Sequence, residues 1–114
     1  MPFTDIETHY IKKLVGEFCF KRSPAHLKDQ FRNEYRIEGL SVILYEVRPV
    51  WDDPTRFIES PFAKLKYVRS TNEWQLFWQR SDMKWHRYEP MKSTKDLKDL
   101  INEIDKDPHG CFFG

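Results

Sequence analysis

The hydrophobic pattern of this chain changes period at Phe31, and that change constrains the fold more than any other feature. Before it, apolar residues recur at the spacing that lines one face of an α-helix. These residues are Tyr10, Ile11, Leu14, Val15 and Phe18. Thr4 and Glu7 have the spacing of a capping box. We therefore predict a helix that begins after Thr4 and ends near Lys21, because Pro24 disfavours helical backbone at the residue before it.

From Phe31 onward apolar and polar residues alternate, which is typical of half-buried β-strands. The alternation predicts five strands, over residues 31–37, 40–47, 62–69, 74–78 and 84–89. The expected turns are Glu38–Gly39, Thr71–Asn72 and Ser81–Met83. The first turn places Ile37 opposite Leu40. The second places Leu65 opposite Trp78, which keeps the apolar side chains on one face.

A second helical stripe follows the strands, and its apolar residues are Leu97, Leu100, Ile101 and Ile104. Ser93 is the expected N-cap, and the helix should end at Pro108 and Gly110. The apolar tail from Cys111 should pack back onto the body. Two such helices can cover one sheet face. The sequence therefore predicts a single α+β domain over residues 1–114, in which an antiparallel meander of about five strands carries an N-terminal and a C-terminal helix on one face.

The longest interruption between two predicted strands is EVRPVWDDPTRFIESP, residues 46–61. It contains three of the seven prolines. Its candidate ligand-binding residues are Glu46, Arg48, Trp51, Asp52, Asp53 and Arg56. If the Trp51 ring anchors this stretch in the core, Trp51→Ala should cost roughly 3–5 kcal/mol of stability. An unchanged melting temperature would instead indicate an exposed, functional tryptophan.

Asp52 and Asp53 form an adjacent acidic pair before Pro54. Paired carboxylates can bind a divalent cation or act as acid and base. Neighbouring side chains on an extended backbone point apart, however, so both seldom reach one ion. We favour a turn, in which aspartate accepts backbone hydrogen bonds and proline fixes φ. Asp52 could also pair with Arg48 or Arg56.

The sheet face without helices is expected to present basic residues interleaved with aromatic ones. Its candidates are Arg32, Arg36, Tyr45, Lys64, Lys66 and Phe77. Such a face suits single-stranded nucleic acid, because bases stack on the rings while cations neutralise phosphates. The same residues also fit a solvated face, in which Lys and Arg stems cover apolar spots, or a homodimer patch. We favour the solvated face, since a net charge of +1 provides no general attraction for nucleic acid.

Residues 84–88, Lys-Trp-His-Arg-Tyr, contain the one histidine within a predicted strand. His86, flanked by Trp85 and Arg87, could act as a general base oriented by Glu46. A lone histidine in a sheet is more often a packed or hydrogen-bonded structural residue. The fifth strand has no clear register, so the pattern leaves the face of His86 open.

The residue types that hold metals and cofactors show no recognisable motif. Cys19 and Cys111 belong to no Cys-x-x-Cys pair, and the four histidines show no i, i+4 spacing. We therefore expect no cofactor and no metal site, assign no catalytic residue, and interpret both cysteines as buried thiols. We see no signal peptide and no apolar run of ~20 residues, which favours a cytoplasmic protein without membrane contact.

Several segments stand in an order that resembles a known family. They are Ile37–Gly39, Glu46–Pro49, Trp51–Pro54, Lys84–Tyr88 and Asp107–Gly114. The family is a group of short bacterial proteins known as domain of unknown function 3024, and the resemblance runs from about residue 30 to the end. It implies a cytoplasmic, single-domain bacterial protein with no assigned activity, so no catalytic residue is carried over.

Two hypotheses follow for the function. The leading one is a non-enzymatic binding module that acts through the open sheet face or residues 46–61, with a protein partner, a second copy or single-stranded nucleic acid as its ligand. The alternative is a small metal-dependent or acid–base enzyme that uses Glu46, Asp52, Asp53 and His86. An enzyme should gather these side chains in a pocket, whereas a binding module should expose aromatic rings.

Overall fold

The computed structural model describes residues 2–23, 31–80, 82–91 and 93–112. It contains two α-helices and a six-stranded antiparallel sheet, which confirms the predicted α+β fold. The elements are α1 (Asp5–Arg22), β1 (Arg32–Glu38), β2 (Ser41–Val50), β3 (Asp53–Val68), β4 (Glu73–Gln79), β5 (Trp85–Arg87), the 3-10 helix η2 (Glu89–Met91), β6 (Ser93–Thr94) and α2 (Leu97–Lys106).

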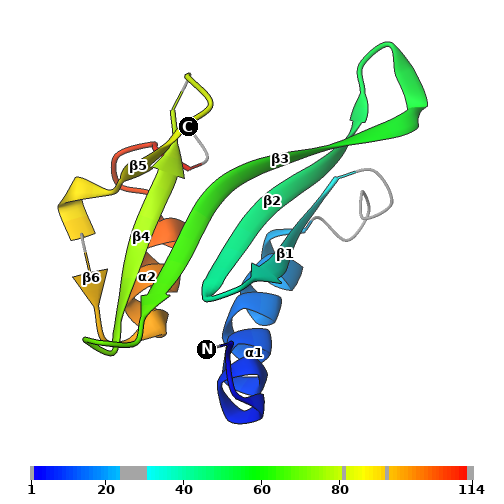
Figure 1. Cartoon of the computed structure of the whole chain (residues 1–114). Coiled ribbons are helices and arrows are strands. Elements are labelled where there is room, and N and C mark those ends of the chain that lie inside the picture. Colours follow the sequence, from blue (N-terminus) through cyan, green and yellow to red (C-terminus); the bar gives the residue numbers. More distant parts are fainter. Residues whose placement is uncertain (1, 24–30, 81, 92, 113–114) are drawn as a thin grey trace.

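The strands follow the order β1-β2-β3-β4-β5, which is the predicted meander (Figure 1). The short β6 was not predicted, because a two-residue strand has no period to detect. It pairs with β4, with Thr94 opposite Trp74. Ser93 therefore lies in a strand and not at a helix cap. The N-cap of α2 is Asp96, whose side chain accepts a hydrogen bond from the Lys98 amide.

The β1–β2 and β3–β4 hairpins have registers that differ by two residues from those predicted. The first turn is Gly39–Leu40, where the glycine has a φ of +60° and Ile37 pairs with Val42. In the β3–β4 hairpin Leu65 pairs with Leu76. A shift of two residues leaves every side chain on its predicted face, because side chains alternate with a period of two.

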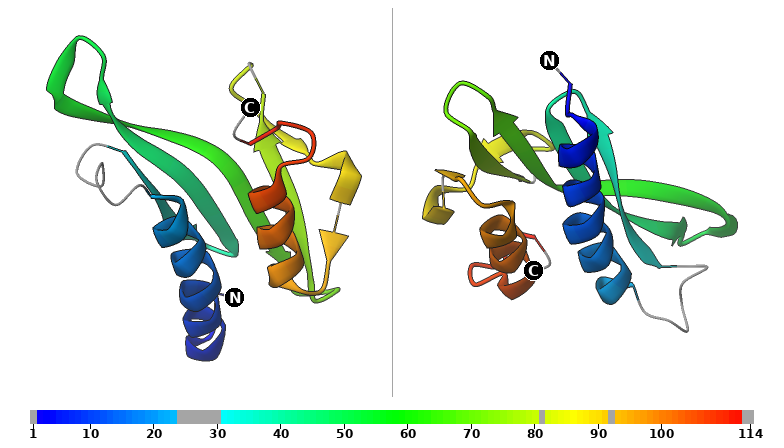
Figure 2. Two further views of the ribbon diagram at one scale, coloured as in Figure 1. Left: turned by 180° about the vertical axis from the view of Figure 1, so that it is seen from behind. Right: turned by 90° about the horizontal axis from the view of Figure 1, so that it is seen from below.

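Both helices pack on the same face of the sheet and form the core with it (Figure 2). The fully buried aliphatic residues are Ile11, Val15, Val42, Leu44, Ala63, Leu65, Leu76, Leu97, Leu100 and Ile104. The C-terminal tail also returns to this core, since the ring of Phe112 lies 5.2 Å from that of Tyr88. The predicted packing of the tail is confirmed as far as Phe112, and residues 113–114 lie outside the described part.

The two cysteines are free thiols in different environments. Cys19 is buried, as predicted, and burial raises the pKa of its thiol to about 12. Cys111 is only half-buried, which corrects the prediction, although burial raises the pKa of this thiol too. Cys111 packs against the edge of the core, next to the buried Phe112, rather than within it.

The interpretation of residues 46–61 as an interruption is wrong, because they continue β2 and β3, and beyond Val47, the last β2 residue paired with β1, they form a two-stranded hairpin that projects beyond the rest of the sheet (Figure 1). We call these residues the arm. The pairing shifts between Leu44 and Tyr45 and again between Pro49 and Val50. Pro49 and Pro61 resemble loop residues in sequence, but proline is tolerated at bulges and at open strand edges. A two-stranded arm provides both.

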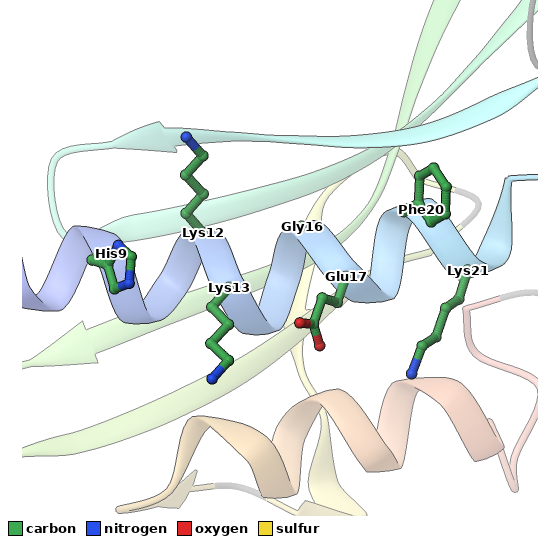
Figure 3. Close-up of a pocket in the computed structure, with 7 residues that line it drawn as sticks. All are labelled: His9, Lys12, Lys13, Gly16, Glu17, Phe20 and Lys21. Carbon is green, nitrogen blue, oxygen red and sulfur yellow. The ribbon is translucent and has the colours of Figure 1, made fainter.

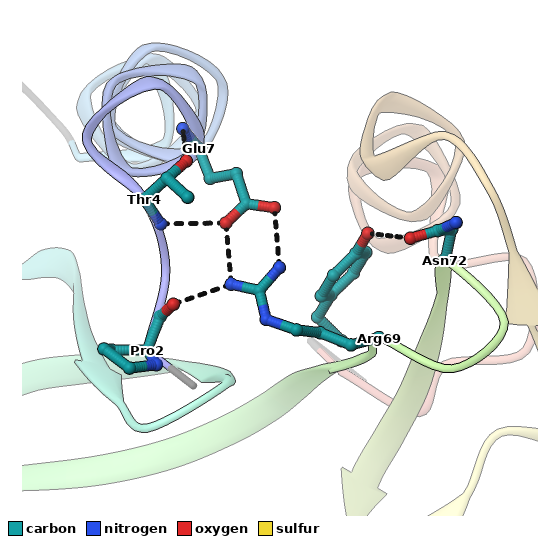
Figure 4. A network of polar contacts seen from close by, with 6 residues as sticks. Pro2, Thr4, Glu7, Arg69 and Asn72 are labelled. Atoms are coloured by element: carbon teal, nitrogen blue, oxygen red, sulfur yellow. Dashed lines mark hydrogen bonds and ion pairs between the residues drawn. The ribbon is translucent and has the colours of Figure 1, made fainter.

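An ion pair between Glu7 and Arg69 links the start of α1 to the end of β3 (Figure 4). The Arg69 guanidinium donates to Glu7 Oε1 at 2.9 Å, to Glu7 Oε2 at 3.2 Å and to the Pro2 carbonyl at 2.6 Å. Glu7 also accepts a hydrogen bond from the Thr4 amide, as the predicted capping box requires. The Arg69 hydrogen bond, followed by that of Thr4, holds the pKa of Glu7 below its usual value.

Candidate binding surfaces

The arm carries three large apolar side chains in solvent. Trp51 is 95% exposed, Phe57 49% and Ile58 41%. Trp51 lies in the turn between β2 and β3, far from the helix-covered core, which overturns its interpretation as a core anchor. Phe57 and Ile58 are adjacent in β3 and therefore point to opposite faces of the arm. The apolar surface thus surrounds the end of the arm.

The acidic pair of the arm has the geometry of a turn. Asp53 Oδ1 accepts hydrogen bonds from the Thr55 amide at 3.1 Å and from the Thr55 hydroxyl at 2.6 Å. Asp52 is exposed and forms no ion pair with Arg48 among the described residues. Arg48 lies instead 3.8 Å from a Glu46 carboxylate oxygen. These contacts give the Asp53 carboxylate a structural partner within the turn.

The charge of the arm is negative. Its ionisable residues are Glu46, Arg48, Asp52, Asp53, Arg56 and Glu59. Two arginines and four carboxylates give a formal charge of −2. Arg56 is exposed and, within the described chain, forms no ion pair with Asp52. The arm therefore combines exposed apolar side chains with a local excess of negative charge.

The uncovered face of the sheet brings several predicted residues together in one row across five strands. From β1 to β5 the row contains Arg36, Ile43, Lys64, Phe77 and Arg87. The charged groups of Lys64 and Arg87 each lie 5.7 Å from the centroid of the Phe77 ring. Arg36 lies 5.1 Å from the centroid of the Tyr45 ring. Cations therefore cover the rings of this face.

The apolar residues of the open face are covered by their own neighbours. Ile43 is 5% exposed, Tyr45 8% and Val47 4%, although none of them belongs to the core under the helices. Long Lys and Arg stems exclude water from such residues while their charges stay in solvent. Lys66 lies on the same face, opposite Ser41, and is exposed. The stems of such charged side chains therefore cover the apolar spots of the open face.

Carboxylates balance much of the positive charge on this face. Arg32 pairs with Glu34 at 2.7 Å. Arg36 pairs with Glu38 at 2.5 Å and with Glu59 at 3.3 Å. A nucleic acid would have to compete with these carboxylates for the arginines. The open face therefore offers no strongly positive surface.

The pairing of β5 defines the face of each of its residues. His86 lies opposite Trp78, on the helix-covered side of the sheet. Trp85 and Arg87 lie on the open face, opposite Gln79 and Phe77. The sequence could not resolve this register, because a three-residue strand shows too little alternation.

His86 has a carboxylate partner that the sequence analysis missed. Its Nε2 lies 2.9 Å from Asp82 Oδ2, and Asp82 Oδ1 also accepts a hydrogen bond from the Lys84 amide. The Lys84 hydrogen bond, followed by that of His86, lowers the pKa of Asp82. The one sign of this contact in the sequence was the i, i+4 spacing of Asp82 and His86 across the turn at Met83, where φ is +64°. His86 therefore has the contacts of a structural histidine.

The structure separates the residues of the enzymatic alternative. Glu46 lies in β2 and His86 in β5, with β3 and β4 between them. Three strand spacings amount to about 14 Å, so Glu46 cannot orient His86 as a general base. Asp52 and Asp53 lie farther out, at the end of the arm. Across the described chain, no three His, Cys, Asp or Glu residues are positioned to hold a metal ion.

Several depressions lie beside α1, away from the arm. The first, of about 600 Å³, is open and is lined by His9, Lys12, Lys13, Gly16, Glu17, Phe20 and Lys21 (Figure 3). The second, of about 360 Å³, runs between α1 and β1, and Gly16, Phe20 and Tyr35 are among its lining residues. None of the predicted ligand-binding residues of the arm or of β5 lines either depression.

Neither α1 nor α2 has the length and apolar character of a membrane-spanning helix. No curated protein and no solved structure matches the chain. The model of one protein family, domain of unknown function (DUF3024), matches residues 3–114. This match includes the N-terminal helix, which the resemblance from about residue 30 did not reach. The chain therefore belongs to the DUF3024 family.

Proposed function

We propose that the protein is a non-enzymatic binding module that contacts a protein partner through the end of the arm. The observation that carries this proposal is Trp51, whose side chain is 95% exposed at the tip of a projecting hairpin. Covering apolar surface is worth roughly 25 cal/mol per Å², and tryptophan is enriched among the residues that dominate binding energy. An uncovered tryptophan on an extended arm is well placed to enter an apolar pocket of another protein.

The neighbours of Trp51 support a protein as the ligand. Phe57 and Ile58 expose apolar surface on opposite faces of the arm. A partner that surrounds the tip can cover both faces. The formal charge of −2 on the arm would repel the phosphates of a nucleic acid. Apolar surface with a negative rim fits a hydrophobic cleft bordered by basic side chains.

The test compares capture by four forms of the full chain from a lysate of the source cells. They are the natural chain, Trp51→Ala, Phe57→Ala and the control Ile6→Ala. Ile6 is 83% exposed on α1, so its substitution removes an equally accessible apolar side chain away from the arm. Circular dichroism and a thermal melt should establish that each variant is folded.

We expect at least one protein to be retained by the natural chain and by Ile6→Ala but reduced at least about tenfold by Trp51→Ala, since that factor corresponds to 1.4 kcal/mol of binding energy. Phe57→Ala should give a smaller reduction. The proposal is overturned if no protein shows this dependence on Trp51. Binding that nuclease treatment abolishes would overturn it in favour of a nucleic acid.

A further inference from the structure

Strand β1 forms one edge of the sheet and pairs only with β2 among the described strands. The Asn33 amide points away from β2, because it donates to Ser23 Oγ at 2.9 Å. Backbone groups alternate in direction along a strand of an antiparallel pair. The backbone N–H and C=O groups of Tyr35 and Ile37 therefore also face outward, where another strand can form hydrogen bonds with them.

The side chains of β1 on the open face alternate in charge. In order they are Arg32, Glu34, Arg36 and Glu38. One way in which natural edge strands avoid pairing with their own copies is to carry charged side chains, especially lysines, which repel the same residues of a second copy. Alternating signs have the opposite property, because an antiparallel copy can place each cation beside an anion of the other chain, in addition to the ion pairs that Arg32 and Arg36 form within their own chain.

We propose that β1 pairs with β1 of a second copy of this chain, antiparallel and about a two-fold axis at Tyr35. In this register Glu34 faces the partner's Arg36 and Arg32 faces the partner's Glu38, and symmetry repeats both pairs. Tyr35 exchanges backbone hydrogen bonds with the partner's Tyr35, using the groups that face outward. A register shifted by two residues, with its axis at Glu34 or Arg36, places like charges opposite each other instead.

Exposed apolar residues accompany the same edge. Phe31, just before β1, is 38% exposed, Ile37 is 37% exposed and Phe20 on α1 is 65% exposed. The groove of about 360 Å³ between α1 and β1 continues this surface past Gly16 and Tyr35. Figure 3 shows Phe20 on the side of α1 nearer the strands. A second copy at the edge would cover this surface and extend the sheet across both chains.

The experiment measures molecular mass in solution for the natural chain, E34R, R36E and the double variant E34R/R36E. We expect twice the chain mass of 13.9 kDa for the natural protein. E34R places two cations opposite each other and R36E two anions, so both should be monomers. The double variant exchanges the charges and should be a dimer again. Rescue by the second substitution separates a lost interface from a misfolded chain.

Two controls locate the interface. Lys66→Glu changes a charge on the open face away from β1 and should leave the dimer intact. Trp51→Ala should also leave it intact, so failure of this inference is distinct from failure of the arm as a binding surface. The inference is overturned by a monomeric natural chain, by single variants that remain dimeric, by a double variant that stays monomeric, or by a dimer that either control dissociates.

Discussion

The two halves of the β2–β3 hairpin have the same backbone pairing and opposite surroundings. In the body of the sheet, Val42, Leu44, Ala63 and Leu65 are fully buried beneath the helices. In the arm, Trp51 lies almost entirely in solvent. The same two strands thus carry apolar side chains into the core at one end and into water at the other.

This difference separates the stabilising part of the hairpin from the part available for binding. Buried apolar side chains stabilise the fold in proportion to the area removed from water. The exposed rings of the arm gain little of this energy in the free protein. An isolated two-stranded hairpin is only marginally stable, so the arm depends on the sheet that it extends. Its exposed apolar residues therefore add little to folding, which is the ground on which we propose a partner for them.

The largest expected effect comes from the buried half. Leu44→Ala should lower the free energy of unfolding by about 2–5 kcal/mol, because it leaves a cavity beneath the helices. The matched arm variant Ile58→Ala removes a similar side chain that is 41% exposed and should cost only about 0.5 kcal/mol or less. Urea unfolding of both variants measures the difference, and equal losses would contradict the division of the hairpin.

The next effect concerns the buried hydroxyl of Tyr88. This side chain is fully buried, and its hydroxyl donates to Glu103 Oε2 at 2.6 Å. Tyr88→Phe should cost about 1–3 kcal/mol, because the Glu103 carboxylate loses a donor in a partly buried site. Tyr10→Phe is the control, since its longer hydrogen bond of 3.3 Å to Asp96 is exposed. If thermal melts show that the two variants lose a comparable amount of stability, burial does not explain the contribution of the Tyr88 hydroxyl.

The sequence was most informative where a pattern repeats locally. The spacing of Ile11, Val15 and Phe18 predicted the buried face of α1, and the alternation around Leu65 predicted which strand residues face the helices. The same alternation cannot distinguish registers that differ by two residues, because both bury the same set of side chains. This ambiguity accounts for the displaced position of Ile37 relative to β2.

The sequence was least informative where a contact depends on tertiary structure. Pro49 and Pro61 indicated a loop, and they are compatible with strands because each lies next to a shift in the pairing and pairs with one neighbouring strand in the described sheet. The capping box predicted the role of Glu7 at the helix start, but nothing in the sequence linked Glu7 to Arg69, 62 positions away. The exposure of Trp51 likewise depends on how far the arm projects.

A smaller effect is expected from the charge of Glu7. Glu7→Gln retains a side chain that can complete the capping box but removes the ion pair with Arg69, and should cost about 0.5–1 kcal/mol at neutral pH, because both groups are partly exposed. The pKa of Glu7 is lowered in the folded state, so its contribution is present above the unfolded pKa and is lost as pH falls through the folded pKa. The difference between natural chain and variant should therefore shrink below about pH 4.

Chemical unfolding at several pH values measures this dependence. Glu17→Gln is the matched control, because Glu17 is exposed on the same helix and has no ion pair within the described part of the chain. The Glu17→Gln variant should have the same stability as the natural protein at each pH that is measured. A Glu7→Gln deficit that persists unchanged in acid would show that the ion pair is not its source.

The smallest effect on stability is expected at the residue that carries the proposed function. Trp51→Ala should change the free energy of unfolding by less than about 0.5 kcal/mol, since a 95% exposed side chain leaves no cavity. Trp74→Ala should cost about 3–5 kcal/mol, because that ring is 6% exposed beside Tyr67. Thermal melts of the two variants compare the same side-chain deletion in both environments. A large loss of stability for Trp51→Ala would mean that the ring packs against the protein in solution. The ring would then be unavailable to a partner, which would contradict the arm as a binding surface.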